Sequence, residues 1–478
     1  MVFLATPIFW LLKVMNGKTV PPISNEALFL SAKKLAGKIR RRELKAEDVI
    51  KMYINRINEV NPLINGVVED RYSDAILDAK AADAYLDSIQ HKTEEMETVR
   101  REQPLLGVPL TVKEGVAVKG MTLIAGSLAR KHIRAKATGP TIVYLMRAGA
   151  IPLCVTNTPE YSFYFETYNM VTGRTRNPYN TAFSVGGSSG GEAALLGAGA
   201  SLIGVGSDLV GSIRSPAHFT GIFGHKPTDT STSSKHHFPI MEKPTIVTYL
   251  SIGPMTRYAE DLPLMLTIMS GPKAENLRLN DPVDLKTLHV YYLEEFEPTL
   301  TLTPVESDIK NCIKKAAKYL QSCGAILHEE KFPMANTLEV VLSLMLTTGE
   351  IPHIVNGDNQ NDKLGFVPLS KKPYYTAKLE QIRMNFLTTL KDNGVLLMPV
   401  FPSCAFVHNS FFLRTSSIMY VGIMNILGFP ATSIPMGLNN KKLPIGFQVI
   451  ATPWNDRLCF AVAQQLEKRF KGWTPPNS

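Results

Sequence analysis

Serine chemistry is the most specific chemical signal in this chain of 478 residues. The pattern G-x-S-x-G occurs twice and overlapping, around Ser188 and around Ser189. In α/β-hydrolases this pattern places a nucleophilic serine on a sharp turn between a strand and a helix. That chemistry also needs a later acid and a histidine, and no histidine of this sequence is placed to serve. The pattern therefore predicts serines at a close turn and leaves their mechanism open.

Patterns for nucleotide and metal binding fail at defined positions. Gly204-Val205-Gly206 continues to Leu209, where a dinucleotide fingerprint needs a glycine, and no G-x-x-x-x-G-K occurs. His236-His237 and His328-Glu329-Glu330 lack further ligands at zinc spacing. We therefore expect neither a cofactor nor a metal, and interpret these residues as surface or core side chains.

The segment from 186 to 224 has an unusual composition, with eleven glycines in 39 residues. Between Ser184 and Ile213 the only charged residues are Glu192 and Asp208. A neutral stretch rich in glycine and serine is typical of buried loops whose backbones approach closely. We expect a buried loop system here.

Several separated segments resemble the amidase signature family and occur in the order of that family. They are VKE (Val112–Glu114), VGGSSGGEAALLGAG (Val185–Gly199), the segment Gly204–Thr228 with GSDLVGSIRS at its centre, and the block from Leu427 to Asp456. The resemblance covers roughly residues 27–473, and it is strongest to the members that hydrolyse fatty-acid amides. It implies an α/β fold with a large mixed central β-sheet covered by helices on both faces, in a single domain.

The resemblance also implies a Ser–Ser–Lys triad. Ser212 matches the nucleophile that becomes acylated, Ser188 the bridging serine and Lys113 the base. A lysine acts as a base only when neutral, and burial lowers its pKa toward that state. Ser188 would pass the proton of Ser212 to Lys113 and later return one to the leaving amine. A cis peptide bond between Gly187 and Ser188 is implied as well.

Further residues are assigned around the nucleophile by the same resemblance. The backbone N–H groups expected to hold the oxyanion are those of Leu209, Val210, Gly211 and Ser212. The residues expected to support them from behind are Ser189, Asp208 and Arg214, with Arg214 either pairing with Asp208 in a functional role or forming an ordinary buried ion pair. Val210 departs from the family, which has glycine there. Valine keeps the N–H, but a positive φ would be an outlier for a β-branched residue.

Strand-like and helix-like periodicities alternate around these residues, which favours an α/β fold. Strands are expected near 106–112 (ending at Lys113), 150–155, 288–292, 325–329, 395–400 and 443–450. Helices are expected near 141–148, 307–320 and 458–470, over the charged residues 78–101, and around 50–57 with an end before Asn61-Pro62. Relative to the family, the chain is shortened between about 365 and 379, where the acyl channel would lie.

The N-terminal residues 2–12 (VFLATPIFWLL) are apolar. As a helix they would reach about 17 Å, which is too short for a hydrocarbon core of about 30 Å. We therefore expect residues 1–22 to form an anchor in a membrane face, with a frayed leader as the alternative, ahead of a catalytic domain over 27–473. The net charge is +9, and a basic run lies between Lys33 and Arg42. This run is either a solvated face or a contact with anionic lipid.

The five cysteines are scattered and form no CxxC, which argues against a disulfide framework. The resemblance implies a membrane-associated protein that faces the cytosol, at the endoplasmic reticulum or a lipid droplet. The favoured function is a serine amidase that hydrolyses primary fatty amides and N-acylethanolamines to fatty acid and ammonia or amine. A catalytically impaired lipid-binding homologue and a glutamine-hydrolysing amidotransferase component remain open. The expected partners are the lipid amide and a membrane surface, without nucleic acid, and a homodimer is left open.

Overall fold

The computed structural model describes residues 17–240, 248–298, 302–329, 332 and 369–477. The apolar stretch over 2–12 lies outside these residues, as does the start of the region expected to be shortened. Within the described part of the chain, no helix is both long and apolar enough to cross a membrane.

An eleven-stranded mixed β-sheet forms the centre of the molecule, in the order β1-β3-β2-β6-β8-β7-β12-β13-β11-β9-β10. Its strands are β1 (Val67–Asp70), β2 (Pro109–Lys113), β3 (Ile151–Thr156), β6 (Ile203–Asp208), β7 (Phe223–Lys226), β8 (Ser251–Thr256), β9 (His289–Tyr292), β10 (Ile326–His328), β11 (Gly394–Met398), β12 (Ala431–Leu438) and β13 (Pro444–Ile450). β2 runs parallel to both of its neighbours, β3 and β6. The carboxyl ends of β2 and β6 therefore lie at one edge of the sheet.

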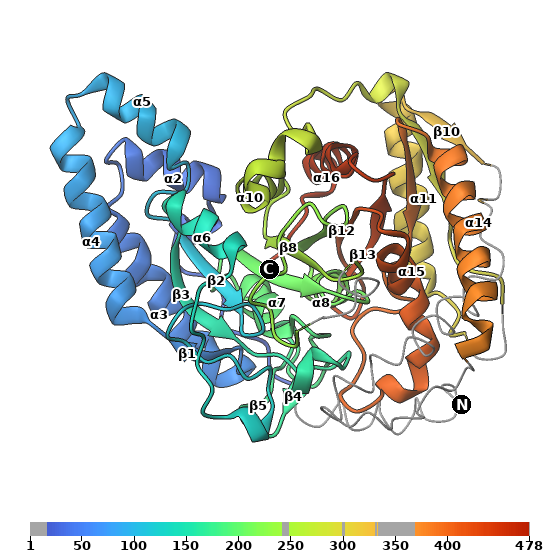
Figure 1. Cartoon of the computed structure of the whole chain (residues 1–478), viewed down its shortest axis with the longest axis horizontal. Coiled ribbons are helices and arrows are strands. Elements are labelled where there is room, and N and C mark those ends of the chain that lie inside the picture. Colours follow the sequence, from blue (N-terminus) through green and yellow to red (C-terminus); the bar gives the residue numbers. More distant parts are fainter. Residues whose placement is uncertain (1–16, 241–247, 299–301, 330–331, 333–368, 478) are drawn as a thin grey trace.

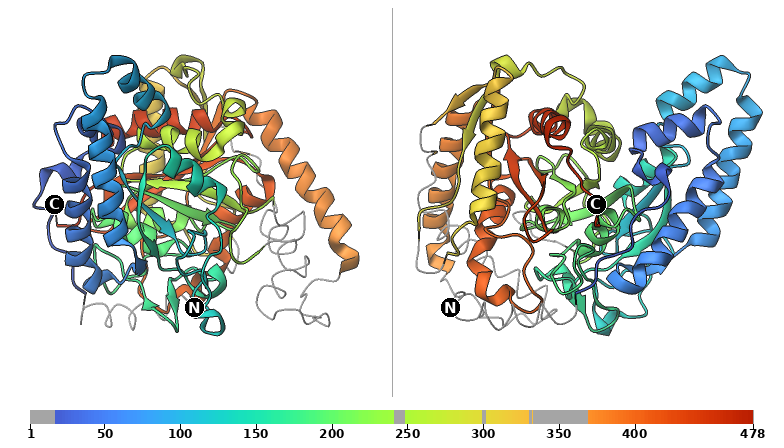
Figure 2. Two further views of the ribbon diagram at one scale, coloured as in Figure 1. Left: turned by 60° about the vertical axis from the view of Figure 1, so that its left-hand side comes forward. Right: turned by 180° about the vertical axis from the view of Figure 1, so that it is seen from behind.

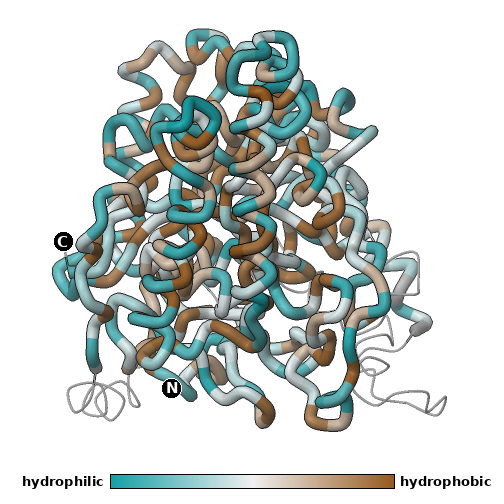
Figure 3. Tube along the Cα trace, turned by 90° about the vertical axis from the view of Figure 1, so that its left-hand side faces the viewer, coloured by the Kyte–Doolittle hydropathy of each residue, from teal (hydrophilic) through white to brown (hydrophobic). Residues whose placement is uncertain are grey.

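Helices pack against both faces of this sheet (Figures 1 and 2), which confirms the expected fold. They are α2 (Ala32–Arg40), α3 (Ala46–Ile64), α4 (Tyr72–Ile89), α5 (Thr93–Glu102), α6 (Pro140–Arg147), α7 (Gly190–Gly197), α8 (Arg214–Thr220), α10 (Asp261–Ser270), α11 (Ser307–Ser322), α14 (Lys372–Leu390), α15 (Met419–Leu427) and α16 (Asp456–Phe470). Seen from the side of α2–α5, hydrophilic and hydrophobic residues alternate along the outer helices (Figure 3), as expected for helices with one buried face.

Two hydrophobic clusters flank the centre of the molecule. One joins α2–α7 with β2 and β3, and the other joins α8, α11 and α14–α16 with β9 and β11–β13. In Figure 1, α2–α5 lie on the left and α11, α14 and α15 on the right, with α7, α8 and β8 near the centre. The glycine-rich segment therefore lies where the two halves of the core meet.

Most predicted elements are confirmed, with two corrections in the N-terminal helices. The helix around 50–57 continues through Pro62 to Ile64, so the predicted end before Asn61 is wrong. The Asn61 side chain explains the extension, because its Oδ1 accepts from the N–H groups of Gly66 and Val67 beyond the helix end. The charged stretch 78–101 forms two helices, α4 and α5, with a break at Gln90–Lys92.

The glycine-rich segment is buried as expected, but it is more regular than a loop system. It contains helix α7 and strand β6, both completely buried. Its glycines allow close packing: a Cβ on Gly191 would lie 2.3 Å from the backbone nitrogen of Asn157, and one on Gly204 would lie 2.0 Å from Glu192 Oε2. Here glycine serves helix and strand packing as well as turns.

The basic run at 33–42 is largely engaged within the protein. Four of its six cations form ion pairs: Lys34 with Glu260, Lys38 and Arg41 with Glu43, and Arg42 with Asp83. Helix α2 buries its apolar side and presents these charges outward. This arrangement favours the interpretation of the run as a solvated face.

Candidate active site

Three elements bring the predicted triad residues to one place. Lys113 is the last residue of β2, Ser188 lies just before α7, and Ser212 lies in the turn between β6 and α8. Ser188 and Ser212 line the same small pocket. The backbone N–H of Ser189 donates to the carbonyl oxygen of Ser212 at 3.0 Å, which ties the two serine turns together.

The Lys113 ammonium nitrogen makes short contacts with two serine hydroxyls. Its Nζ lies 2.6 Å from Ser188 Oγ and 2.9 Å from Ser207 Oγ. The Lys113 side chain is fully buried and Ser188 is 1% exposed. Hydrogen bonds as short as the one to Ser188 hold the two groups in position for proton transfer.

Burial lowers the pKa of Lys113 to about 7, because removing the ammonium group from water disfavours its charged form. The negative charges of Asp208, Glu114 and Glu192 oppose this shift. Both glutamates are themselves buried, which raises the pKa of Glu114 to about 7 and that of Glu192 to about 8. A large fraction of Lys113 is therefore neutral near pH 7.

The backbone at Ser188 has the predicted conformation. The peptide bond between Gly187 and Ser188 is cis. A Cβ on Gly187 would lie 2.5 Å from the carbonyl oxygen of Tyr164, so only glycine fits there.

The Ser212 hydroxyl forms no hydrogen bond with any described residue, and its side chain is 9% exposed. It faces the pocket that Ser188, Ser207, Leu209 and His237 also line. This pocket has a volume of about 20 Å³, which is room for about one water molecule. The contact through which Ser188 would take the Ser212 proton is thus not formed here, and the relay stays a prediction.

The turn that carries Ser212 is held from behind by Asp208. Its carboxylate accepts from the backbone N–H groups of Gly211 at 2.6 Å and Ile213 at 3.1 Å. The Arg214 guanidinium pairs with it at 3.1 Å and 3.2 Å, so the predicted ion pair is present. Burial alone would raise the pKa of Asp208, but Arg214 and these hydrogen bonds hold it well below its ordinary value.

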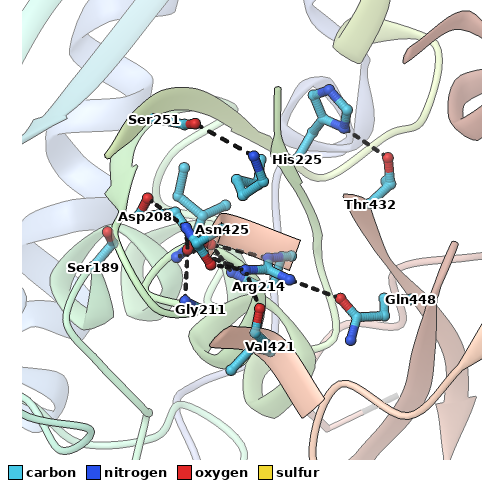
Figure 4. A network of polar contacts seen from close by, with 12 residues as sticks. Ser189, Asp208, Gly211, Arg214, His225, Ser251, Val421, Asn425, Thr432 and Gln448 are labelled. Atoms are coloured by element: carbon cyan, nitrogen blue, oxygen red, sulfur yellow. Dashed lines mark hydrogen bonds and ion pairs between the residues drawn. The ribbon is translucent and has the colours of Figure 1, made fainter. Parts of the chain in front are cut away.

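Arg214 joins this turn to the C-terminal half of the chain (Figure 4). Its guanidinium donates to Asn425 Oδ1 at 2.6 Å, to Gln448 Oε1 at 2.9 Å and to the carbonyl oxygen of Val421 at 3.0 Å. All three acceptors come from the second hydrophobic half, on α15 and β13. The turn that carries Ser212 is therefore fixed by a fully buried, well-paired charge network.

The predicted oxyanion donors differ in availability. The Gly211 N–H already donates to Asp208, so it fits the predicted role less well than its neighbours. The N–H groups of Leu209, Val210 and Ser212 have no acceptor among the described residues. These three donors beside the Ser212 hydroxyl are the ones that a developing oxyanion could use.

Comparison with known proteins decides the family. The family model described as Amidase matches residues 48–372 and 360–460. The chain belongs to the amidase family. It is 38% identical over 495 aligned residues to fatty-acid amide hydrolase 2 of Homo sapiens, covering 96% of this chain and 92% of that protein. Together, the family and this similarity show that the protein is an amide hydrolase.

One further relative and one solved structure are also similar to this chain. The amidase is 27% identical over 481 aligned residues to indoleacetamide hydrolase of Bradyrhizobium diazoefficiens, covering 92% of this chain and 86% of that protein. A solved structure named fatty acid amide hydrolase superposes with a TM-score of 0.76 at 23% identity, covering 92% of this chain and 85% of that one. This likeness shows that the fold is shared.

Val210, the departure from the family pattern, fits the amidase turn without a positive φ. The left-handed position is the next residue, Gly211, with φ +97°. A Cβ on Gly211 would lie 2.3 Å from Val421 Cγ2. The left-handed position, which requires glycine, is therefore still occupied by Gly211. Val210 keeps the backbone N–H of a predicted oxyanion donor.

His237, interpreted from the sequence as a surface or core side chain, lines the candidate site of the amidase. Its Nε2 lies 3.0 Å from Ser207 Oγ and its Nδ1 lies 3.0 Å from the carbonyl oxygen of Pro239. Burial, and then the charge of Lys113, lower the pKa of His237 to about 4, so the ring is neutral at pH 7. Only an Nδ1–H can satisfy Pro239, which leaves Nε2 to accept from Ser207.

This tautomer fixes the direction of a hydrogen-bond chain. Ser207 donates its only hydroxyl proton to His237, so Lys113 must donate to Ser207 Oγ. The carbonyl oxygen of Ser207 lies 3.5 Å from Nζ and can take the second proton of a neutral amine. The lone pair of neutral Lys113 is then directed at Ser188. No spacing rule links His237 to the serines, so only the folded chain reveals it.

Proposed function

We propose that this amidase hydrolyses fatty-acid amides, including primary fatty amides and N-acylethanolamines, to free fatty acid and ammonia or amine. The similarity to fatty-acid amide hydrolase 2 supports the substrate class. The observation that carries the proposed chemistry is the 2.6 Å contact between the buried Lys113 Nζ and Ser188 Oγ. A buried, readily neutral amine directed at a serine is what a serine amidase without a catalytic histidine requires.

In the acylation step, neutral Lys113 accepts the proton of Ser188 while Ser188 accepts the proton of Ser212. Ser212 Oγ forms a bond to the amide carbon, and the carbonyl electron pair moves to the oxygen. The N–H groups of Leu209, Val210 and Ser212 then stabilise the oxyanion. One such donor typically contributes about 3–4 kcal/mol to the transition state.

Collapse of the tetrahedral intermediate breaks the C–N bond. The proton held by Lys113 passes through Ser188 to the nitrogen, because an amide anion is too basic to leave alone. The acyl group remains on Ser212 as an ester. Water then attacks the ester with Lys113 again as the base, so that one amide and one water give one acid and one amine.

We also propose that the protein acts at a cytosol-facing membrane surface, of the endoplasmic reticulum or of a lipid droplet. The apolar residues 2–12 support this, because the transfer of Phe3, Phe9 and Trp10 from water into a membrane surface is favourable. Cosedimentation with phosphatidylcholine vesicles should fall when residues 2–12 are replaced by a serine-rich segment. Unchanged cosedimentation would contradict the proposal.

A substrate panel tests the proposed reaction. Purified protein is assayed with oleamide, N-oleoylethanolamine, and glutamine as the substrate of the amidotransferase alternative. Release of oleic acid is expected from the first two, with loss of at least about 10³-fold in Ser212→Ala. Ser88→Ala, a replacement of an exposed serine on α4, serves as the matched control. Glutamine hydrolysis without fatty-amide hydrolysis would contradict the proposal.

A further inference from the structure

A second cavity adjoins the catalytic pocket and takes no part in the steps above. It has a volume of about 960 Å³ and is lined by residues from 117–137 and 230–240, with Leu250 and Lys273. His237 and Leu250 line both this cavity and the pocket of Ser188 and Ser212. The pocket and the cavity therefore share part of their described walls.

The described lining of this cavity carries one sign of charge. Its ionisable side chains are all cationic apart from histidine: Arg130, Arg134, Lys136, Lys235 and Lys273. No described aspartate or glutamate lines it. Among these five, Arg134 alone has a salt bridge within the described chain, to Glu69 at 2.6 Å. A cavity whose described lining holds more cations than described ion-pair partners concentrates anions.

Arg130 is the cation best placed to bind a ligand. Its guanidinium carbon lies 3.6 Å from the centre of the Phe238 ring, which fixes its orientation. Its Nε is buried and has no hydrogen-bond partner among the residues that the structure describes. The charge of Arg130 acts on the nearby Glu114 carboxyl, which accepts from backbone N–H groups at 124–126. Glu114 Oε2 has no hydrogen-bond partner among the described residues, and Glu114 does not line the cavity. The Arg130 guanidinium is therefore held at the cavity wall in a fixed orientation.

Apolar residues also line the cavity, among them Leu123, Ile133, Phe238 and Ile240. An alkyl chain alone would gain little from five cations, whereas a carboxylate linked to a small organic group suits both parts of this lining. We propose that the cavity receives the amine side of the substrate and binds a carboxylate there. The amidase would then favour fatty-acid amides of amino acids, releasing fatty acid and free amino acid. This inference rests on the proposed function.

The test compares two soluble substrates that differ in one group, N-octanoylglycine and N-octanoylethanolamine. The double variant Arg130→Gln/Lys235→Gln removes two lining cations. The control Lys119→Gln/Lys131→Gln removes the same charge from exposed residues that do not line the cavity. The ratio of kcat/KM for the carboxylate over the ethanolamide should fall about tenfold or more in the first variant and less than twofold in the control. An equal fall in both, or none in either, would overturn the proposal.

A binding measurement keeps this test separate from the proposed function. In Ser212→Ala, calorimetry should show N-octanoylglycine binding at least about tenfold more tightly than N-octanoylethanolamine, with the preference lost when Arg130→Gln/Lys235→Gln is added. Equal affinities would overturn the carboxylate site even if both amides were hydrolysed. If neither amide is hydrolysed by the unaltered protein, the proposed function fails, while the affinities still decide whether the cavity binds the carboxylate.

Discussion

Lys113 is the residue whose protonation state decides the proposed chemistry. Burial lowers its pKa to about 7, and only the neutral form can accept a proton. We therefore predict that kcat/KM for oleamide is low at pH 5.5, rises about tenfold per pH unit below the pKa and levels off above pH 8. A pH profile measured against a Ser212→Ala blank checks this. A flat profile down to pH 5.5, or an inflection near 10, would show that Lys113 is not the base.

His237 is predicted to act by directing the lone pair of Lys113 through Ser207. His237→Ala should lower kcat about tenfold and leave KM within about twofold, because the base loses its orientation while substrate contacts remain. His236→Ala, which removes an exposed neighbour, should change neither constant by more than twofold. Steady-state kinetics of both variants provide the measurement. Equal effects of the two substitutions would exclude this role.

At the scale of single residues, the sequence indicates candidate site residues that lie in contiguous motifs. It misses residues that come into contact only when the chain folds. Ser188, Ser212 and Lys113 are found because each lies in a recognisable segment. His237 and Ser207 come from separate elements, and their relation depends on a contact of 3.0 Å that no spacing shows. Asn425 and Gln448, which hold Arg214, are hidden for the same reason.

At the scale of elements, the turn between β6 and α8 depends on the buried pair Asp208–Arg214. Replacing Arg214 by methionine leaves the carboxylate of Asp208 buried without its partner, so we predict a loss of about 3–5 kcal/mol in the free energy of unfolding. Arg100→Met, at an exposed ion pair, should cost less than about 0.5 kcal/mol. Urea unfolding measures both, and a similar cost for the two would refute the importance of the network. Adding Asp208→Asn to Arg214→Met should recover part of the loss.

Within this turn, we predict different effects on stability and turnover for substitutions of Val210 and of Gly211. Because Val210 has no positive φ and is 7% exposed, Val210→Gly should cost about 2–3 kcal/mol of stability and change turnover less than about threefold. Gly211→Ala should abolish turnover, since its Cβ would meet Val421. Turnover assays with urea titration distinguish the two. A sharp gain of turnover in Val210→Gly would instead support the impaired homologue.

Element predictions succeed where periodicity is strong and fail where packing decides. The amphipathic α11 and the apolar β3 are found from their spacing. β6 is missed because its sequence IGVGSD has too many small residues to show a strand pattern, and α7 is missed because its helix is glycine-rich. Both are packed so closely against neighbouring groups that larger residues would not fit at their glycines.

At the scale of the whole molecule, the candidate active site lies where two hydrophobic clusters meet. β2 and α7 belong to the first cluster, while Asn425 and Gln448 reach the turn that carries Ser212 from the second. Neither half alone contains Lys113, Ser212 and the partners of Arg214. This explains why the site residues extend over most of the chain and why one domain carries the function.

The central claim is that Ser212 is a nucleophile activated through Ser188 and Lys113. The most direct measurement is labelling with a fluorophosphonate, followed by mass spectrometry of the peptides. A single adduct on Ser212 is predicted, formed at least about a hundredfold more slowly in Lys113→Ala and in Ser188→Ala. An adduct on another serine, or labelling of Ser212 at an unchanged rate in both variants, would contradict the account.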